Sequence, residues 1–147
     1  MELSGSYSFD AAPDRVWALL MDPAVLSSCI PGCERFEPDG DDRYRVTLTV
    51  GLAAITGTYQ GTVVLTDKVP PTSYGLVVEG QGRPGFVKGT SAIALRAVGA
   101  ATAVDVTASV QTGGAIARIG QRLIGSVAKM MMDRFFECLR SKLQPSS

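Results

Sequence analysis

The sequence predicts an α+β fold in which a curved antiparallel sheet of about six to seven strands closes around one long C-terminal helix. From about residue 34 to residue 110, apolar and polar residues alternate, which is the two-residue period of a half-buried strand. A segment of helical period follows at about 114–143 and is the longest periodic segment of the chain. The length of 147 residues suits one domain, which we expect to span 1–147.

One short strand and two short helices precede the main run of strands. Apolar side chains at odd positions predict the strand at 3–9. The first helix starts at Pro13, because a proline in the first turn has no intrahelical hydrogen bond to lose. The second starts at Pro23, behind an Asp22 side chain that can cap it, and the Pro-Gly pair at 31–32 ends it.

Glycine, proline and aspartate divide the strand region at 39–41, 69–71, 80–85 and 99–100. The third of these stretches, Gly80–Gly85, matches the GxGxxG spacing of a dinucleotide site. Such a site needs a helix that starts inside the motif, whereas Pro84 and a further strand follow here. We interpret the stretch as a hairpin loop, and short turns of this kind predict one antiparallel meander.

The long C-terminal segment carries apolar residues on one helical face and is the one predicted element that can cover the sheet. The residues of this face are Ile116, Ile119, Leu123, Val127, Met130 and Met131. Gly120 and Gly125 interrupt the segment, although glycine inside a helix is destabilising by roughly 0.5–1 kcal/mol relative to alanine. Two explanations stay open: the helix approaches the sheet closely there, or it leaves volume for a ligand.

A curved sheet contacts one helix closely over only part of its length, so side-chain volume decides whether the remaining space is filled. Small residues occupy strand positions that we expect to face inward: Gly57, Gly61, Ala92, Ala94 and Ala108. Larger residues would line the space that they leave. The candidate ligand-binding residues are Trp17, Leu26, Tyr44, Tyr59, Tyr74, Phe86, Val127, Met130, Met131 and Arg134. Each alone would be ordinary core, and only the combination predicts a cavity.

Arg134 is the charged member of this set. By helical angle it lies near the centre of the apolar face. In one interpretation it lies past the edge of the sheet, or pairs with an acid, while its aliphatic stem packs. In the other it meets the polar group of a ligand or of a partner.

The residue types exclude several chemistries. The chain has no histidine, which removes Ser-His-Asp and Cys-His nucleophiles and the usual zinc sites. Cys29 and Cys33 lack CxxC spacing, so we expect no metal and no cofactor. With Cys138 the cysteines number three, and an odd number argues against a disulfide framework. We interpret Cys29, Pro31, Gly32 and Cys33 as a rigid turn that forms a lid over the pocket.

Charge is balanced overall and uneven along the chain. Basic and acidic residues number 14 each, so the basic excess of a nucleic-acid-binding protein is missing. Acids gather in 1–42 and bases in 114–143. Either the two ends of the fold attract each other, or Arg118, Arg122 and Lys129 form a basic helix face for an anionic partner or a membrane surface.

The sequence also gives an expectation about location. No apolar run reaches the roughly 18 residues of a membrane span. The N-terminus carries strand-like alternation instead of a signal peptide. We therefore expect a cytoplasmic protein, with peripheral contact at the inner membrane face as the closest approach to a bilayer.

Several segments resemble one known family over nearly the whole chain. They are Pro-Asp-Arg-Val-Trp at 13–17, Asp-Pro at 22–23, Cys-Ile-Pro-Gly-Cys-Glu at 29–34, Gly-Thr-Tyr-Gln-Gly at 57–61 and Gly-Ala-Ile-Ala-Arg-Ile-Gly at 114–120. These segments are similar to those of the CoxG family of carbon monoxide dehydrogenase subunits. The resemblance implies the helix-grip fold of START-like and birch-pollen-allergen-like proteins (the SRPBCC superfamily), with an internal hydrophobic cavity. It also implies association with a molybdenum hydroxylase of the carbon monoxide dehydrogenase type, and it carries no catalytic motif.

Three function hypotheses follow. In the preferred one, the chain binds an apolar, lipid- or quinone-like ligand without catalysis, as an accessory protein to that enzyme. In the alternative, it is an assembly or membrane-recruitment factor that carries no small molecule and docks through the basic helix face. The third, a cyclase or hydratase, would need a poised acid or base in the cavity, for which Tyr44, Tyr59 and Arg134 are the candidates.

Overall fold

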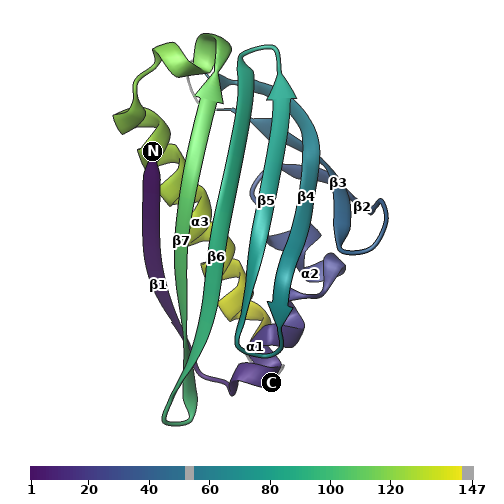
Figure 1. The fold of residues 1–147 in the computed structure, drawn as a ribbon, viewed down its shortest axis with the longest axis vertical. Coiled ribbons are helices and arrows are strands. Elements are labelled where there is room, and N and C mark those ends of the chain that lie inside the picture. The colour runs from purple at the N-terminus through teal and green to yellow at the C-terminus, as the bar shows by residue number, and fades with distance from the viewer. Residues whose placement is uncertain (52–54, 144–147) are drawn as a thin grey trace.

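The structure, a computed structural model, describes residues 1–51 and 55–143 (Figure 1). The chain begins with β1 (Glu2–Phe9), α1 (Pro13–Leu20) and α2 (Pro23–Cys29). Six strands follow: β2 (Cys33–Pro38), β3 (Arg43–Val50), β4 (Gly57–Val69), β5 (Ser73–Gly82), β6 (Gly85–Val98) and β7 (Ala101–Gly113). The short 3₁₀ helix η2 (Gly114–Arg118) and the long helix α3 (Gln121–Leu143) complete the described chain.

Seven antiparallel strands form one sheet in the order β1-β7-β6-β5-β4-β3-β2. Consecutive strands from β2 to β7 pair with each other, and β7 also pairs with β1. Helix α3 crosses one face of the sheet diagonally, and α1 and α2 lie near its C-terminal end (Figure 1). The predicted fold class, a curved meander that grips a long helix, is confirmed.

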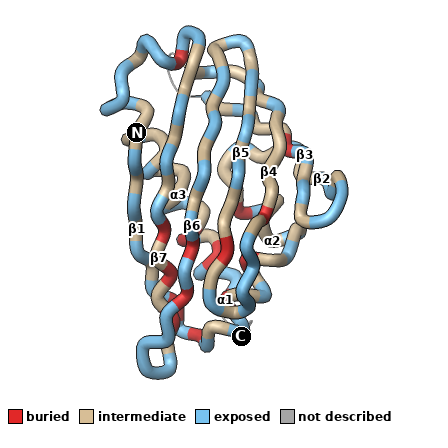
Figure 2. The backbone as a smooth tube through the Cα atoms, in the orientation of Figure 1, coloured by how far each residue is buried: buried red, intermediate tan, exposed pale blue. Residues whose placement is uncertain are grey.

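The tightly buried core occupies the part of the sheet nearest α1 (Figure 2). The C-terminal half of α3 contributes Phe136, Leu139 and Leu143 to this core, and α1 contributes Val16 and Leu20, all at most 7% exposed. Toward the opposite end of the sheet most positions are half-buried or exposed (Figure 2). Helix and sheet therefore pack closely over one part of their length and loosely over the other.

The side chains of β6 that point inward are one position away from those expected. Its buried residues are Ile93 and Leu95, whereas Ala92 and Ala94 are exposed on the outer face. The expectation that these two alanines face inward is therefore wrong. Because side chains alternate along a strand, an error of one position assigns every side chain to the opposite face.

The long helix begins later than its periodicity predicts. Gly120 has a φ of +100°, a left-handed conformation that interrupts helical geometry, so α3 starts after it. Leu123 is 45% exposed, and the predicted apolar face is wrong at this end. Gly125 does lie within α3, where an added Cβ would come within 3.4 Å of Met1 Sδ. This is an ordinary van der Waals distance, so a close approach of helix and first strand does not require glycine at 125.

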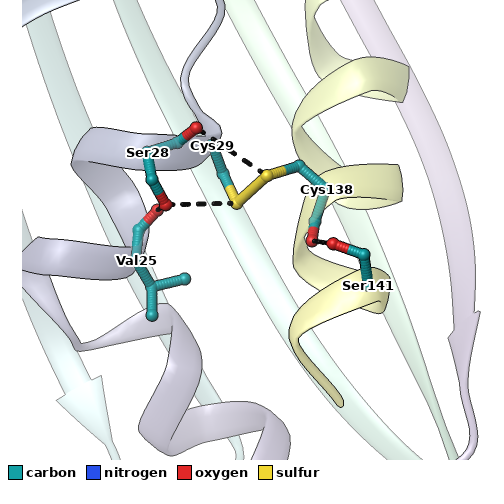
Figure 3. Close-up of a disulfide and its surroundings, with 5 residues drawn as sticks. All are labelled: Val25, Ser28, Cys29, Cys138 and Ser141. Carbon is teal, nitrogen blue, oxygen red and sulfur yellow. Dashed lines mark hydrogen bonds between the residues drawn. A yellow bond between two sulfur atoms is a disulfide. The ribbon is translucent and has the colours of Figure 1, made fainter. Parts of the chain in front are cut away.

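A disulfide joins Cys29 of α2 to Cys138 of α3, with the two Cα atoms 5.3 Å apart (Figure 3). The expectation of no disulfide is therefore wrong. An odd number of cysteines excludes only complete pairing, and here Cys33 keeps a free thiol. The two bonded cysteines are separated by 109 positions, so only the fold reveals their proximity.

The uneven charge distribution does not draw the two ends of the chain together through ion pairs. In 1–51 and 55–143, every ion pair lies within one helix, within one strand or between neighbouring parts of the sheet. The ends meet through hydrogen bonds to backbone carbonyls instead. Arg15 donates to the carbonyl of Leu143 at 3.1 Å, and Arg140 donates to that of Ser8 at 3.1 Å.

The sheet has two free edges, β1 and β2. Strand β1 is tied to α3 because the Tyr7 hydroxyl donates to Asp133 Oδ1 at 2.6 Å and accepts a hydrogen bond from the Lys129 ammonium at 3.2 Å. The hydrogen bond from Tyr7 is the main reason that the pKa of Asp133 lies below its ordinary value. Strand β2 is irregular, since its register against β3 shifts between Cys33 and Arg35.

We predict that Thr102→Val destabilises the fold by about 1–3 kcal/mol. The Thr102 side chain is fully buried, and its hydroxyl donates to the Ala11 carbonyl at 2.7 Å, which holds the β1–α1 connection against β7. Valine keeps the shape and leaves that carbonyl without its donor. Urea unfolding would measure the loss. Thr107→Val, at an exposed position of the same strand, should change stability by no more than about 0.5 kcal/mol, and equal effects of the two substitutions would contradict the prediction.

Candidate ligand cavity

A cavity of about 380 Å³ lies between the sheet and α3. Its volume falls in the range of small-molecule sites, roughly 300–1,000 Å³. The helix side consists of Ala128, Met131, Met132, Phe135 and Phe136. The apolar residues on the sheet side are Leu3, Phe36, Val46, Leu48, Tyr59, Val63, Leu65, Tyr74, Leu76, Val78, Ile93, Val106 and Ala108. Helix α1 adds Leu20, and α2 with the turn after it adds Leu26, Ile30 and Pro31.

Small residues border this space for two different reasons. Ala108 on β7 and Ala128 on α3 border the cavity with a single methyl group each, which leaves volume between sheet and helix. Gly61 also borders it, but an added Cβ there would overlap the backbone of Glu79. The glycine is needed for the close approach of β4 to β5.

Five of the predicted ligand-binding and lid residues border the cavity: Leu26, Pro31, Tyr59, Tyr74 and Met131. They come from α2, the turn after it, β4, β5 and α3. The fold therefore brings side chains from across the whole chain to one apolar space.

Trp17 and Tyr44 lie one layer behind the lining. The Trp17 ring meets Tyr74 edge to face, with ring centroids 5.4 Å apart. The Tyr44 ring stacks on Phe36, with centroids 4.6 Å apart. Each supports an aromatic residue that borders the cavity and does not border it itself.

Phe86, Val127, Met130 and Arg134 lie away from the cavity. Phe86 is 42% exposed, because the inward residues of β6 are the odd-numbered ones. On α3 the inward face is rotated from the predicted one, so Val127 and Met130 lie beside it. Arg134 is exposed, and the prediction that it lies at the centre of the apolar face is wrong.

The expected lid corresponds to α2 and the turn that follows it. Leu26 and Pro31 face the cavity, whereas Cys29 is bonded to Cys138. Gly32 has a φ of +75°, and its carbonyl accepts a hydrogen bond from the Thr49 backbone at 2.9 Å, which fixes the turn to β3. Cys33 does not border the cavity, and burial raises the pKa of its thiol.

Sequence reasoning missed much of the helix side of the cavity. Ala128, Met132, Phe135 and Phe136 all border it. Their spacing of three or four residues marks one face of a helix. The helical period assigns the wrong face when it is counted from residue 116, because the helix is interrupted at Gly120.

The lining is almost entirely apolar, and its polar groups have different surroundings. The Tyr59 hydroxyl donates to the Ile55 carbonyl at 2.6 Å, and burial raises its pKa. Tyr74 is 5% exposed, and burial raises the pKa of its hydroxyl strongly. No lysine or arginine borders the cavity, and Glu79, which does, is exposed. Such a space can bind a neutral molecule through apolar burial, at about 25 cal/mol per Å².

Metal ligation and membrane spanning find no support within 1–51 and 55–143. That part of the chain holds no group of three or more cysteine, aspartate or glutamate residues placed to bind a metal ion. Likewise, none of its helices combines the length and the hydropathy required to cross a bilayer.

Comparison with solved structures supports the fold. A conserved protein from Geobacillus kaustophilus is 38% identical, with a TM-score of 0.94 over 97% of this chain and 94% of that one. A START superfamily protein from Mycobacterium smegmatis has a TM-score of 0.73 at 9% identity, covering 97% and 96% of the two chains. The Zhui aromatase/cyclase from Streptomyces has a TM-score of 0.70 at 14% identity, covering 97% and 92%. The last two likenesses show the START-like fold alone.

No protein with a curated description matches the sequence. The family profile of CoxG, a carbon monoxide dehydrogenase subunit, matches residues 5–144, which is nearly the whole length. That extent agrees with the START-like fold and with the apolar cavity between sheet and helix. The chain therefore belongs to the CoxG family of carbon monoxide dehydrogenase subunits.

Proposed function

We propose that this protein binds an apolar small molecule, lipid- or quinone-like, in the cavity between its sheet and α3, without catalysing a reaction. The observation that carries the proposal is an almost wholly apolar space of about 380 Å³. Apolar surface that faces such a space is stabilised when a ligand of similar polarity fills it. Leu26, Tyr59, Tyr74 and Met131 are the proposed contact residues from the predicted set.

In the same proposal, α2 and the turn at Pro31 form the lid. Leu26, Ile30 and Pro31 border the cavity from this short segment. The segment is seven helical residues plus a turn. The disulfide to α3 and the hydrogen bond between Gly32 and Thr49 hold it in place.

Membership of the CoxG family supports a partner. We propose that the protein serves a molybdenum hydroxylase of the carbon monoxide dehydrogenase type, on the cytoplasmic side, in peripheral contact with the membrane. Arg118 and Arg122 are exposed near the start of α3 and would form the basic surface. Lys129 is less suited to this role, since its ammonium group already contacts Asp133 and Tyr7.

An enzymatic role has weaker support. General acid–base chemistry needs a titratable group in hydrogen-bonding reach of a substrate and poised near the working pH. Of the candidates, Arg134 lies outside the cavity and Tyr44 lies behind it. The Tyr59 hydroxyl is occupied by the Ile55 carbonyl, and burial moves its pKa further above neutrality.

We predict that Ala108→Phe lowers the affinity for N-phenyl-1-naphthylamine, a neutral apolar fluorophore, by about tenfold or more, because the ring would occupy ligand volume. Fluorescence titration measures the affinity, and circular dichroism with thermal unfolding checks the fold. Ala92→Phe is the matched control: it lies on the neighbouring strand, is exposed, and should leave affinity within about twofold.

Two outcomes would contradict the proposed function. A folded Ala108→Phe variant that binds the fluorophore as tightly as the wild type would show that binding occurs elsewhere. Absence of any saturable binding by the wild type, together with no lipid in native mass spectra of gently purified protein, would remove the carrier role itself.

A further inference from the structure

Tyr74 is one of the polar side chains in a mainly apolar wall, which also includes Tyr59, Gln60, Thr62, Glu79 and Ser91. It lies at the start of β5, borders the cavity and is 5% exposed. Its ring is fixed by the edge-to-face contact with Trp17. In residues 1–51 and 55–143, no hydrogen bond reaches its hydroxyl, whereas the hydroxyl of Tyr59 on the next strand is satisfied by the Ile55 carbonyl.

In 1–51 and 55–143 no fully enclosed side-chain oxygen or nitrogen lacks a hydrogen-bond partner, so the Tyr74 hydroxyl is not a buried orphan. It is a donor at a mainly apolar surface of the cavity, and its surroundings decide what it can bind. Ile93 lies opposite it on β6, and Leu76 is the next inward residue on β5. Neither of these side chains offers a polar group to a water that binds the hydroxyl. A ligand that fills the cavity can supply the acceptor in place of water.

The chemistry of the lining narrows the ligand further. The phenol is neutral at physiological pH, since burial raises its pKa, and it therefore acts as a donor. No lysine or arginine borders the cavity, so a carboxylate or phosphate buried there would lack a counter-ion. A plain hydrocarbon would leave the hydroxyl unsatisfied.

We propose that the Tyr74 hydroxyl donates a hydrogen bond to an uncharged oxygen of the cavity ligand and thereby selects neutral apolar molecules that carry a carbonyl or similar acceptor. This inference rests on the proposed function and specifies its ligand class. Trp17, which contacts the ring from behind, acts as the positioning residue that holds the hydroxyl in place.

The test compares two probes of nearly equal shape, fluorenone, which carries a ketone oxygen, and fluorene, which lacks it. Tyr74→Phe should weaken fluorenone binding by about threefold to tenfold and leave fluorene binding within about twofold, because only one hydrogen bond is removed. Titration calorimetry or competition with N-phenyl-1-naphthylamine measures both affinities. Tyr44→Phe is the control, because Tyr44 stacks on Phe36 and does not border the cavity, so the ratio of the two affinities should not change.

The outcomes separate this inference from the function on which it rests. Equal losses for both probes in Tyr74→Phe, or no loss for either, would overturn the role of the hydroxyl while the carrier function stands. Failure of the wild type to bind either probe would overturn the carrier function.

The disulfide supports a second inference on independent grounds. It joins α2, which supplies Leu26 to the cavity wall, to α3, which supplies Met131 on the opposite side (Figure 3). Cys29 is 4% exposed, so the bond lies within the packing between the two helices. Cys138, on the α3 side, is half-buried.

We infer that the Cys29–Cys138 bond is a latch on the lid that a dithiol reductant can open. In this exchange the dithiol gives two electrons and two protons, the sulfur–sulfur bond breaks, and two cysteine thiols form while the dithiol becomes a disulfide. The covalent constraint between α2 and α3 is then gone. Only non-covalent contacts, among them the hydrogen bond between Gly32 and Thr49, still hold the segment.

The latch is tested by the rate at which bound N-phenyl-1-naphthylamine leaves the protein. Dithiothreitol should accelerate release from the wild type by about fivefold or more, since local opening becomes easier. Cys138→Ala should release quickly with or without the reductant. Cys33→Ala, which removes only the free thiol, should respond like the wild type.

Thiol counting before reduction tests whether the bond is formed in the sample. One reactive thiol per chain, that of Cys33, is expected. If the Cys138→Ala variant does not fold, reduction of the wild type still gives the answer. A release rate that reduction leaves unchanged, or three free thiols in protein purified without reductant, would overturn the latch.

Discussion

A single helix covers a sheet of seven strands, and the packing of its C-terminal half fixes its position on the sheet. The place of the cavity depends on that position. Phe136 stacks on Tyr7 of β1 with ring centroids 4.2 Å apart and lies 6.1 Å from Phe9. Leu139 is completely buried beside them. This end of α3 cannot move without breaking the core. The remaining part of the sheet curves away from a helix that is already fixed, and space results.

Core and cavity share the same strands. Leu65, Tyr74, Ile93 and Val106 belong to the buried core and also border the cavity. The floor of the site is therefore as rigid as the core itself. The lid is different, because α2 is short and contributes few side chains to the core. In the proposed function, a rigid floor with a small lid would suit a site that admits a ligand without unfolding.

The sequence predicts the fold well because local patterns determine it. The strand period, the two prolines at helix starts and the long apolar segment each match an element of the structure. Which side chains of a strand point inward is harder to predict. An error of one position assigns the side chains of β6, Phe86 among them, to the wrong face of the sheet. The interruption at Gly120 rotates the helix face that periodicity assigns to Arg134. The disulfide and the solitary hydroxyl of Tyr74 depend on contacts between distant segments, and no local pattern signals such contacts.

The irregular β2 edge has a consequence for how copies of the chain can associate. Its register shift at Cys33 and Arg35, together with the exposed charges of Glu34 and Glu37, interrupts the row of backbone groups that another strand would need. At the opposite edge, β1 is bonded to α3 through Tyr7. Strand-to-strand association of two copies is therefore disfavoured at the β2 edge.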